Sequence, residues 1–210
     1  MRPLQLDAAN PGSARMPRLG MVACLLFAVL MDCMPLPAAE EAFSVVQSTR
    51  EQPEMGTFPE YVVLTGASRV GVLPPQNSRV ETDYAARRLK LQVQDSKASI
   101  VLEFTTNRFG IVTTNSSARL LQLVQNRFPD AAIQPARIAY LGTDKGLAFD
   151  VERTTVYKTR LTTRMAFVST PDGLLEISMT TSTDYFASLE GTFTTFLGCV
   201  QIRPGKLSDG

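Results

Sequence analysis

Short runs in which apolar and polar residues alternate recur along the chain between residues 61 and 182. The clearest is RLKLQVQ at residues 88–94, which places three apolar side chains on one face and basic or amide side chains on the other. A period of two is typical of a strand in a sheet that exposes one face to water. Similar runs predict strands at residues 61–66, 68–75, 99–106, 109–114, 137–142, 146–153, 156–170 and 174–182.

Two segments interrupt these strands with apolar residues at helical spacing. In residues 115–130 the start can be capped by Asn115 or Ser116, and Pro129 prevents the helix from continuing. In residues 183–202 spaced phenylalanines and leucines form one apolar stripe. The order of strands, helix, strands and helix, with hairpin-type links such as TPDG, predicts an α+β domain: a largely antiparallel sheet with two principal helices packed on it.

The strand pair around TPDG at residues 170–173 leads directly into the second helix, and YLGTDKGLAFDVER at residues 140–153 places a glycine-containing turn before a long strand. In these features the sequence resembles the PsbP-like fold family, over residues 58–202. The resemblance implies an α/β/α sandwich. Among the members of that family, exported bacterial proteins of unknown activity fit best, and they imply no catalytic residue.

An uncharged apolar segment of thirteen residues, 19–31, lies between Arg18 and Asp32. A helix needs about 20 apolar residues to cross the hydrocarbon core of a bilayer, whereas a secretory signal has a shorter core with basic residues before it and small residues after it. We therefore expect residues 1–39 to be a signal peptide, with Met16 as an alternative start. The mature protein is then exported, to the periplasm or the extracellular space.

Cys33 offers a second interpretation, in which the protein is a lipoprotein anchored in the envelope. A lipid-attachment signal has small residues before the cysteine, but here Leu30, Met31 and Asp32 precede it. The charge of Asp32 argues against processing at this position. Cleavage of the signal would leave Cys199 as a lone thiol, which we expect to be buried and inert.

The remaining length fits one domain that can bury a core without disulfides. We expect a flexible arm or linker at residues 40–58, a single α+β domain at residues 59–203, and a disordered tail at residues 204–210.

Charge and residue types narrow the possible functions. Without residues 1–39 the chain has equal numbers of basic and acidic residues, so its overall charge favours neither nucleic acid nor an acidic membrane surface. The chain contains no histidine, which excludes Ser-His-Asp and Cys-His hydrolases as well as histidine metal sites. The spacings show no Cys-x-x-Cys pair and no phosphate loop. We therefore expect no catalytic residue, no metal and no cofactor.

One group of basic residues is a candidate binding face for a phosphate, a carboxylated ligand or an acidic partner. Its members are Arg88, Lys90, Lys158, Arg160 and Arg164. They come together only if their two strands are neighbours in the sheet. The competing interpretation is an ordinary solvated strand face, in which Asp150 and Glu152 pair with the row. Replacing Arg160 and Arg164 with Ser should weaken binding of an anionic partner, if there is one, and should leave folding unchanged.

These features predict an exported, non-catalytic binding or accessory protein of the cell envelope. Its partner would be an unknown protein or a small anionic ligand, with no nucleic acid and only transient membrane contact through the signal segment. Two alternatives stay open: a lipid-anchored envelope lipoprotein, and a hydrolase whose carboxylate or Ser-Lys chemistry the sequence does not reveal.

Overall fold

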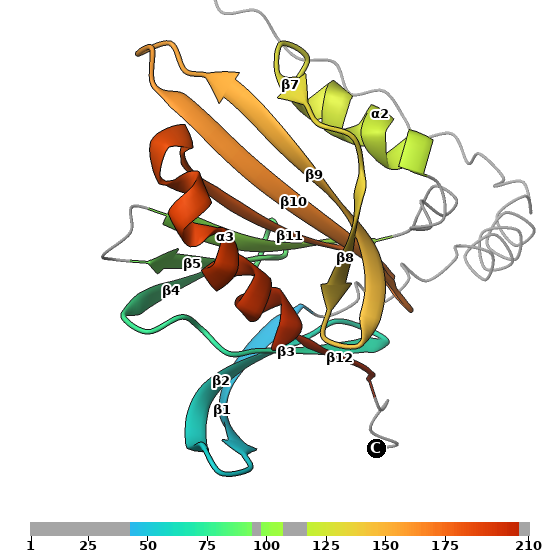
Figure 1. Ribbon diagram of the computed structural model, residues 1–210. Helices are drawn as coiled ribbons and strands as arrows, with labels where there is room; N and C mark the ends of the chain where they lie inside the picture. The colour runs from blue at the N-terminus through green and yellow to red at the C-terminus, as the bar shows by residue number, and fades with distance from the viewer. Residues whose placement is uncertain (1–42, 94–97, 107–116, 206–210) are drawn as a thin grey trace, which may run out of the picture. The chain divides into compact units, whose positions relative to one another are not determined.

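The computed structural model describes residues 43–93, 98–106 and 117–205, all of which belong to the compact unit Glu41–Gly210. Within these residues every strand pair is antiparallel. The strands form two sheets, and two helices pack on the larger one (Figure 1). The α+β prediction is therefore confirmed.

The larger sheet has eight strands. In spatial order they are β4 (Ser78–Asp83), β5 (Arg88–Val93), β6 (Ala98–Thr106), β11 (Gly173–Ser182), β10 (Arg160–Thr170), β9 (Asp144–Thr154) and β7 (Ala132–Ile133), with β8 (Arg137–Leu141) also paired to β9. The smaller sheet has the order β1 (Ser44–Gln52), β2 (Gly56–Leu64), β3 (Ser68–Val72) and β12 (Gln201–Pro204).

The two helices cover opposite faces of the larger sheet. Helix α2 (Ser117–Arg127) buries Leu120 and Val124 in one apolar cluster, and helix α3 (Thr183–Gly198) buries its phenylalanines in another. The strand residues alternate accordingly, because neighbouring side chains in a strand point to opposite faces. In β10, Met165 and Phe167 contact the α2 cluster, whereas Ala166 and Val168 belong to the α3 cluster.

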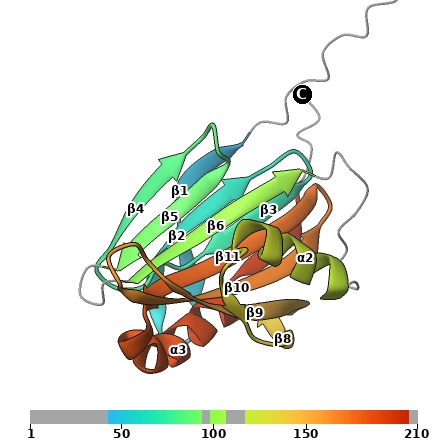
Figure 2. The ribbon, with the colours of Figure 1, turned by 90° about the horizontal axis from the view of Figure 1, so that it is seen from above.

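The smaller sheet shares the α3 side of the larger one. Val63, Val70 and Val72 of the smaller sheet lie in the same cluster as Leu89 and Leu102 of the larger sheet. Figure 1 shows β1 and β2 below β4 and β5, and in the view from above in Figure 2 the strands of the two sheets overlap. One apolar core is thus enclosed by both sheets and by α3.

Most of the predicted elements are confirmed, with small shifts at their ends. The strands at residues 61–66, 68–75, 88–94, 99–106, 137–142, 146–153 and 174–182 correspond to β2, β3, β5, β6, β8, β9 and β11. The TPDG hairpin joins β10 to β11, where Thr170 pairs with Gly173. The predicted strand at residues 109–114, the caps Asn115 and Ser116 and the predicted signal peptide lie outside the described residues.

Three predicted boundaries are wrong. The arm at residues 40–58 is structured from Ser44 onward, because β1 pairs with β2 along its whole length. The predicted strand at 156–170 begins only at Arg160, since residues 155–159 form a turn closed by hydrogen bonds. The last helix ends at Gly198, and the residues after it form β12, which reaches Pro204 inside the predicted tail.

Candidate functional site

The structure does not bring the five predicted basic residues together. Strands β5 and β10 are separated by β6 and β11, so Arg88 and Lys90 lie far from the other three residues. They also point to the α2 side of the sheet, because their neighbours Leu89 and Leu91 face the α3 cluster. Arg160 and Arg164 share the other face of β10. Lys158 lies in the turn before that strand.

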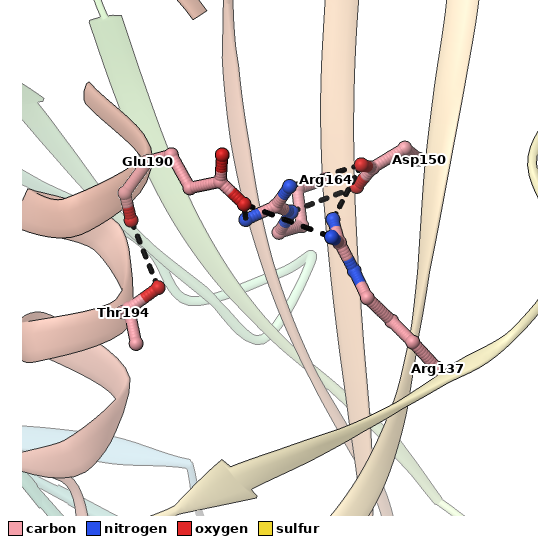
Figure 3. A network of polar contacts seen from close by, with 5 residues as sticks. All are labelled: Arg137, Asp150, Arg164, Glu190 and Thr194. Atoms are coloured by element: carbon pink, nitrogen blue, oxygen red, sulfur yellow. Dashed lines mark hydrogen bonds and ion pairs between the residues drawn. The ribbon is translucent and has the colours of Figure 1, made fainter. Parts of the chain in front are cut away.

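Arg164 is buried in a network of ion pairs between the larger sheet and α3 (Figure 3). Its Nε and Nη2 donate to the two carboxylate oxygens of Asp150 at 2.8 and 2.9 Å. Its Nη1 lies 2.8 Å from Oε1 of Glu190 in α3, and its guanidinium is 4.8 Å from the ring centre of Phe186. Arg137 on β8 forms a second ion pair with Asp150. Each of the three guanidinium nitrogens of Arg164 therefore has a carboxylate partner, and this residue links α3 to the sheet.

The charges of this network reinforce one another. Burial opposes ionisation of Asp150, but the hydrogen bonds and charge of Arg164, followed by those of Arg137, outweigh burial and hold the pKa of Asp150 below its ordinary value. Burial likewise opposes the charge of Arg164, and its hydrogen bonds to Asp150 and Glu190 hold the pKa of Arg164 above its ordinary value. The predicted pairing of Asp150 with the basic row is thus found, and it occupies Arg164.

Arg88 and Lys90 also have acidic partners. Nη2 of Arg88 lies 2.7 Å from Oε2 of Glu103 on β6, and Nζ of Lys90 lies 3.4 Å from Oε2 of Glu81 on β4. These side chains are half-exposed, so each pair contributes little to stability. Of the five predicted residues, Lys158 and Arg160 are the two for which the described part of the chain provides no ion-pair partner.

A carboxylate pair lies on the α2 side of the larger sheet. Glu176 on β11 is buried and directly opposite Glu103 on β6. Nη1 of Arg127, at the end of α2, donates to both oxygens of Glu176 at 2.6 and 2.8 Å. Burial raises the pKa of Glu176, and the charge of Arg127 only partly opposes that effect. The sequence alone did not single out this pair, because the two glutamates belong to strands that are distant in the chain.

A second buried ion pair lies on the outer face of the smaller sheet, the face turned away from the core. Arg50 on β1 donates from Nε to Oε1 of Glu60 on β2 at 2.9 Å, and from Nη1 to the carbonyl of Cys199 at 2.6 Å. The guanidinium passes over Gly71 of β3. A Cβ at Gly71 would collide with the Glu60 carboxylate and lie 2.9 Å from Nη2 of Arg50. The absence of a side chain at this position makes room for the ion pair.

Two arginines border a hollow beside this ion pair. Arg69 on β3 and Arg203 on β12 are directly opposite each other in the antiparallel pair, and both are exposed. A small hollow of about 30 Å³ lies between them and is also lined by Glu60, Gly71 and Gln201. It adjoins a larger hollow of about 560 Å³ that shares Gln201 and Arg203.

Neither Arg69 nor Arg203 has an acidic partner within the described residues. Nη2 of Arg203 donates to Oε1 of Gln201 at 2.8 Å. The carboxylate of Glu60 is already neutralised by Arg50. Sequence reasoning missed this site because the residues just before Arg203 were assigned to a helix and those after it to a disordered tail, and nothing in the sequence shows that β12 pairs with β3.

The position of Cys199 differs from the prediction. Cys199 is half-buried at the C-terminal cap of α3, rather than buried within the helix. In residues 43–93, 98–106 and 117–205, no cluster of three or more Cys, Asp or Glu side chains is placed to hold a metal ion. Over the same residues, none of the helices has the length and apolar character needed to span a membrane.

Comparisons with known proteins give similarity in structure only. No protein-family model matches the chain, and no curated protein matches it. Among solved structures, the fold is similar to that of LpqN, which is involved in cell envelope biogenesis of Mycobacterium tuberculosis, with a TM-score of 0.47 and 11% sequence identity. The match covers 76% of this chain and 92% of that one. The comparisons do not identify the PsbP-like family, so that resemblance stays a prediction.

Proposed function

We propose that the protein is an exported, non-catalytic binding protein of the cell envelope, and that it holds a small anionic ligand between β3 and β12. The observation that carries this proposal is the direct opposition of Arg69 and Arg203, with no carboxylate in ion-pair contact with either in the described residues. Location in the envelope rests on the apolar segment at residues 19–31.

Two like charges directly opposite each other in an antiparallel pair destabilise the sheet. A bound anion removes that cost, because a guanidinium group matches a phosphate or carboxylate with two parallel hydrogen bonds. Arg69 and Arg203 approach the small hollow from neighbouring strands, so one anionic group can accept from both. The amide of Gln201 lines the same hollow and supplies a further donor.

The sizes of the two hollows indicate the kind of ligand. The small hollow has about the volume of one water molecule, which is enough for the tip of a phosphate or carboxylate group. The larger one has room for an attached organic body and is lined by both polar and apolar groups, among them Gln52, Thr143 and Val200. The ligand class is therefore a small organic molecule with one anionic group.

The carboxylate pair of Glu103 and Glu176 supports a hydrolase less well than Arg69 and Arg203 support the binding of an anion. Both oxygens of Glu176 accept hydrogen bonds from Arg127. Arg88 donates to Oε2 of Glu103, and Nη2 of Arg127 lies 4.0 Å from Oε1 of Glu103. A general acid or a nucleophile needs an oxygen that is free to meet the substrate. We therefore treat this cluster as structural.

Calorimetric titration with glycerol phosphate tests the proposal, because this probe has a phosphate and a polar body, and glycerol alone serves as the ligand control. We expect glycerol phosphate to bind and to be recovered unchanged. Arg69→Gln and Arg203→Gln should each weaken binding at least about tenfold, the loss expected when one charge-assisted contact is removed. Arg79→Gln, at an exposed arginine on β4, is the matched control and should bind like the wild type.

Three results would contradict the proposal. If glycerol phosphate, inorganic phosphate and citrate all fail to bind, the protein does not hold a small anion. If glycerol phosphate binds equally well to Arg203→Gln and to the wild type, the site lies elsewhere. Conversion of glycerol phosphate to glycerol would show that the protein is an enzyme.

A further inference from the structure

The turn between β9 and β10 lies at one end of the larger sheet (Figure 1), and it carries two neighbouring apolar residues that are exposed. Val156 is 92% exposed and Tyr157 is 88% exposed, the two highest values among the large apolar residues described. The turn itself is well defined, because the amide of Lys158 donates to the carbonyl of Thr155, and the amide of Thr155 donates to the carbonyl of Thr159, both at 2.9 Å. The exposed pair is thus presented on a closed turn.

The residues at this turn are unusual for their positions. Central turn positions favour Gly, Pro, Asn, Asp and Ser, which adopt the required backbone angles or form local hydrogen bonds. Here they are occupied by a β-branched residue and an aromatic residue. Lys158 adopts a φ of 62°, a conformation that favours glycine or asparagine. Local preferences that conflict with the fold are expected where a segment serves a function.

Basic side chains surround the apolar tip on both sides of the hairpin. Arg160 pairs with Thr154 across the two strands, so Arg153 and Arg160 point to opposite faces. The guanidinium of Arg153 is held 5.3 Å from the ring centre of Phe128. Lys158 and Arg160 are exposed and form no ion pair within the described residues. The chain without residues 1–39 is neutral overall, but this end of the hairpin is therefore locally basic.

From this arrangement we propose that the tip of the β9–β10 hairpin docks on the surface of an anionic lipid bilayer. Val156 and Tyr157 enter the interfacial region, and Arg153, Lys158 and Arg160 contact the lipid headgroups. Tyrosine is enriched at this depth of the membrane because its ring is apolar and its hydroxyl is polar. Each basic residue near an anionic surface adds to the attraction. The proposal does not depend on the anion site of the smaller sheet.

The order of these groups favours a bilayer over a protein partner. A bilayer presents anionic headgroups first and apolar chains beneath them, and the hairpin presents an apolar tip with basic residues behind it. A stable protein interface buries about 800 Å² on each side, which two apolar side chains and one turn do not supply. An acidic protein that covers this tip is therefore an outcome of the test and not the proposal.

Lysine acetylation of the full chain, read by mass spectrometry, gives a site-specific test with lipid vesicles. A site-specific readout is needed because residues 19–31 can bring the chain to vesicles by themselves. Vesicles that contain phosphatidylglycerol should protect Lys158 from acetylation, whereas pure phosphatidylcholine vesicles should not. Lys145, which is exposed near the opposite end of β9, is the internal control and should react equally in both samples.

Variants test whether the residues of the hairpin tip cause the protection of Lys158. The double variant Val156→Ser/Tyr157→Ser should lose the protection of Lys158, and Tyr140→Ser, at an exposed tyrosine on β8, should keep it. In co-sedimentation, Lys158→Asn should weaken the affinity for phosphatidylglycerol vesicles about fivefold, the factor that one basic residue supplies. Asparagine tolerates the backbone conformation at this position, so unfolding cannot explain the loss.

The proposal is overturned if Lys158 reacts equally with and without phosphatidylglycerol vesicles, even when the chain sediments with them. Equal protection by the two vesicle types would also overturn it, since charge would then play no part. Protection that appears only on addition of a protein fraction would assign the tip to a protein partner instead.

Discussion

Replacement of Arg164 with Met separates a structural role of this residue from a role in binding. Both interpretations of the sequence placed Arg164 on an exposed strand face, where it can be lost without loss of folding. In the structure its side chain is 7% exposed and bonded to Asp150 and Glu190. Met has a similar length and no charge, so the variant removes the ion pairs while keeping most of the apolar contact.

The expected loss follows from the exposure of each partner. Breaking a buried ion pair by removing one member costs about 3–5 kcal/mol. Asp150 retains Arg137 as a partner, which moves the expected cost to the lower end of that range. Glu190 is 46% exposed, so water can solvate its carboxylate in place of Arg164. Loss of that contact should lower the free energy of unfolding by less than about 1 kcal/mol. We therefore expect Arg164→Met to lower the free energy of unfolding by about 3 kcal/mol.

The loss should depend on pH with a definite sign. In the wild type the pKa of Asp150 lies below its ordinary value of 3.8, so the stabilisation it provides is present above that pH and is lost as pH falls through the lowered pKa. In the variant only Arg137 opposes the effect of burial on Asp150, so the pKa of Asp150 rises. The difference between wild type and variant should therefore be largest near neutral pH and should shrink below about pH 4.

Urea unfolding followed by circular dichroism, at neutral and acidic pH, measures both effects. Arg137→Gln is the matched control, because its side chain is 43% exposed and we expect its loss to cost clearly less. A destabilisation by Arg164→Met below about 1 kcal/mol would refute the structural role. A loss that stays constant from neutral to acidic pH would refute the coupling to Asp150.

Three further predictions concern single positions. Gly71→Ala should lower the free energy of unfolding by about 2–3 kcal/mol, because the added Cβ displaces the buried Arg50–Glu60 pair. Gly191→Ala in α3 should instead raise it by about 0.5–1 kcal/mol, since no atom lies within 4 Å of the added Cβ; urea unfolding measures both. The free energy of unfolding of Glu176→Gln should increase relative to that of the wild type as pH rises above 4.5. Burial raises the pKa of Glu176, so the folded wild type resists ionisation of this carboxyl whereas the unfolded chain does not. Denaturation curves between pH 4 and 8 that keep a constant difference would contradict that last prediction.

The sequence was most informative where one strand or helix determines its own burial. Leu89 and Leu91 are fully buried, as their alternation with basic residues predicts, and Leu120 and Val124 are buried in α2 at helical spacing. Alternation shows which side chains share a face of one strand. It does not show which strands are neighbours, and for that reason Arg88 and Arg164 were grouped although two strands separate them.

The sequence was least informative where pairing partners are distant in the chain. In β1 the residues before Pro53 resemble a linker, yet they form a full strand because β2 pairs with them, while Pro53 lies in the turn. Val200 continues the helical spacing of α3, but the helix ends at Gly198 and its last turn is capped by backbone bonds of Cys199. The site at Arg203 depends on this change from helix to strand.

The position of β12 also fixes when the smaller sheet can be completed during synthesis. Strands β1, β2 and β3 are made first, but the free edge of β3 stays unpaired until residues 201–204 have left the ribosome. An unpaired strand edge is a template for pairing with another chain, and pairing between distant segments is slow. A chain that ends before Gln201 would keep this edge exposed, so loss of the last ten residues should lead to aggregation although the larger sheet is intact.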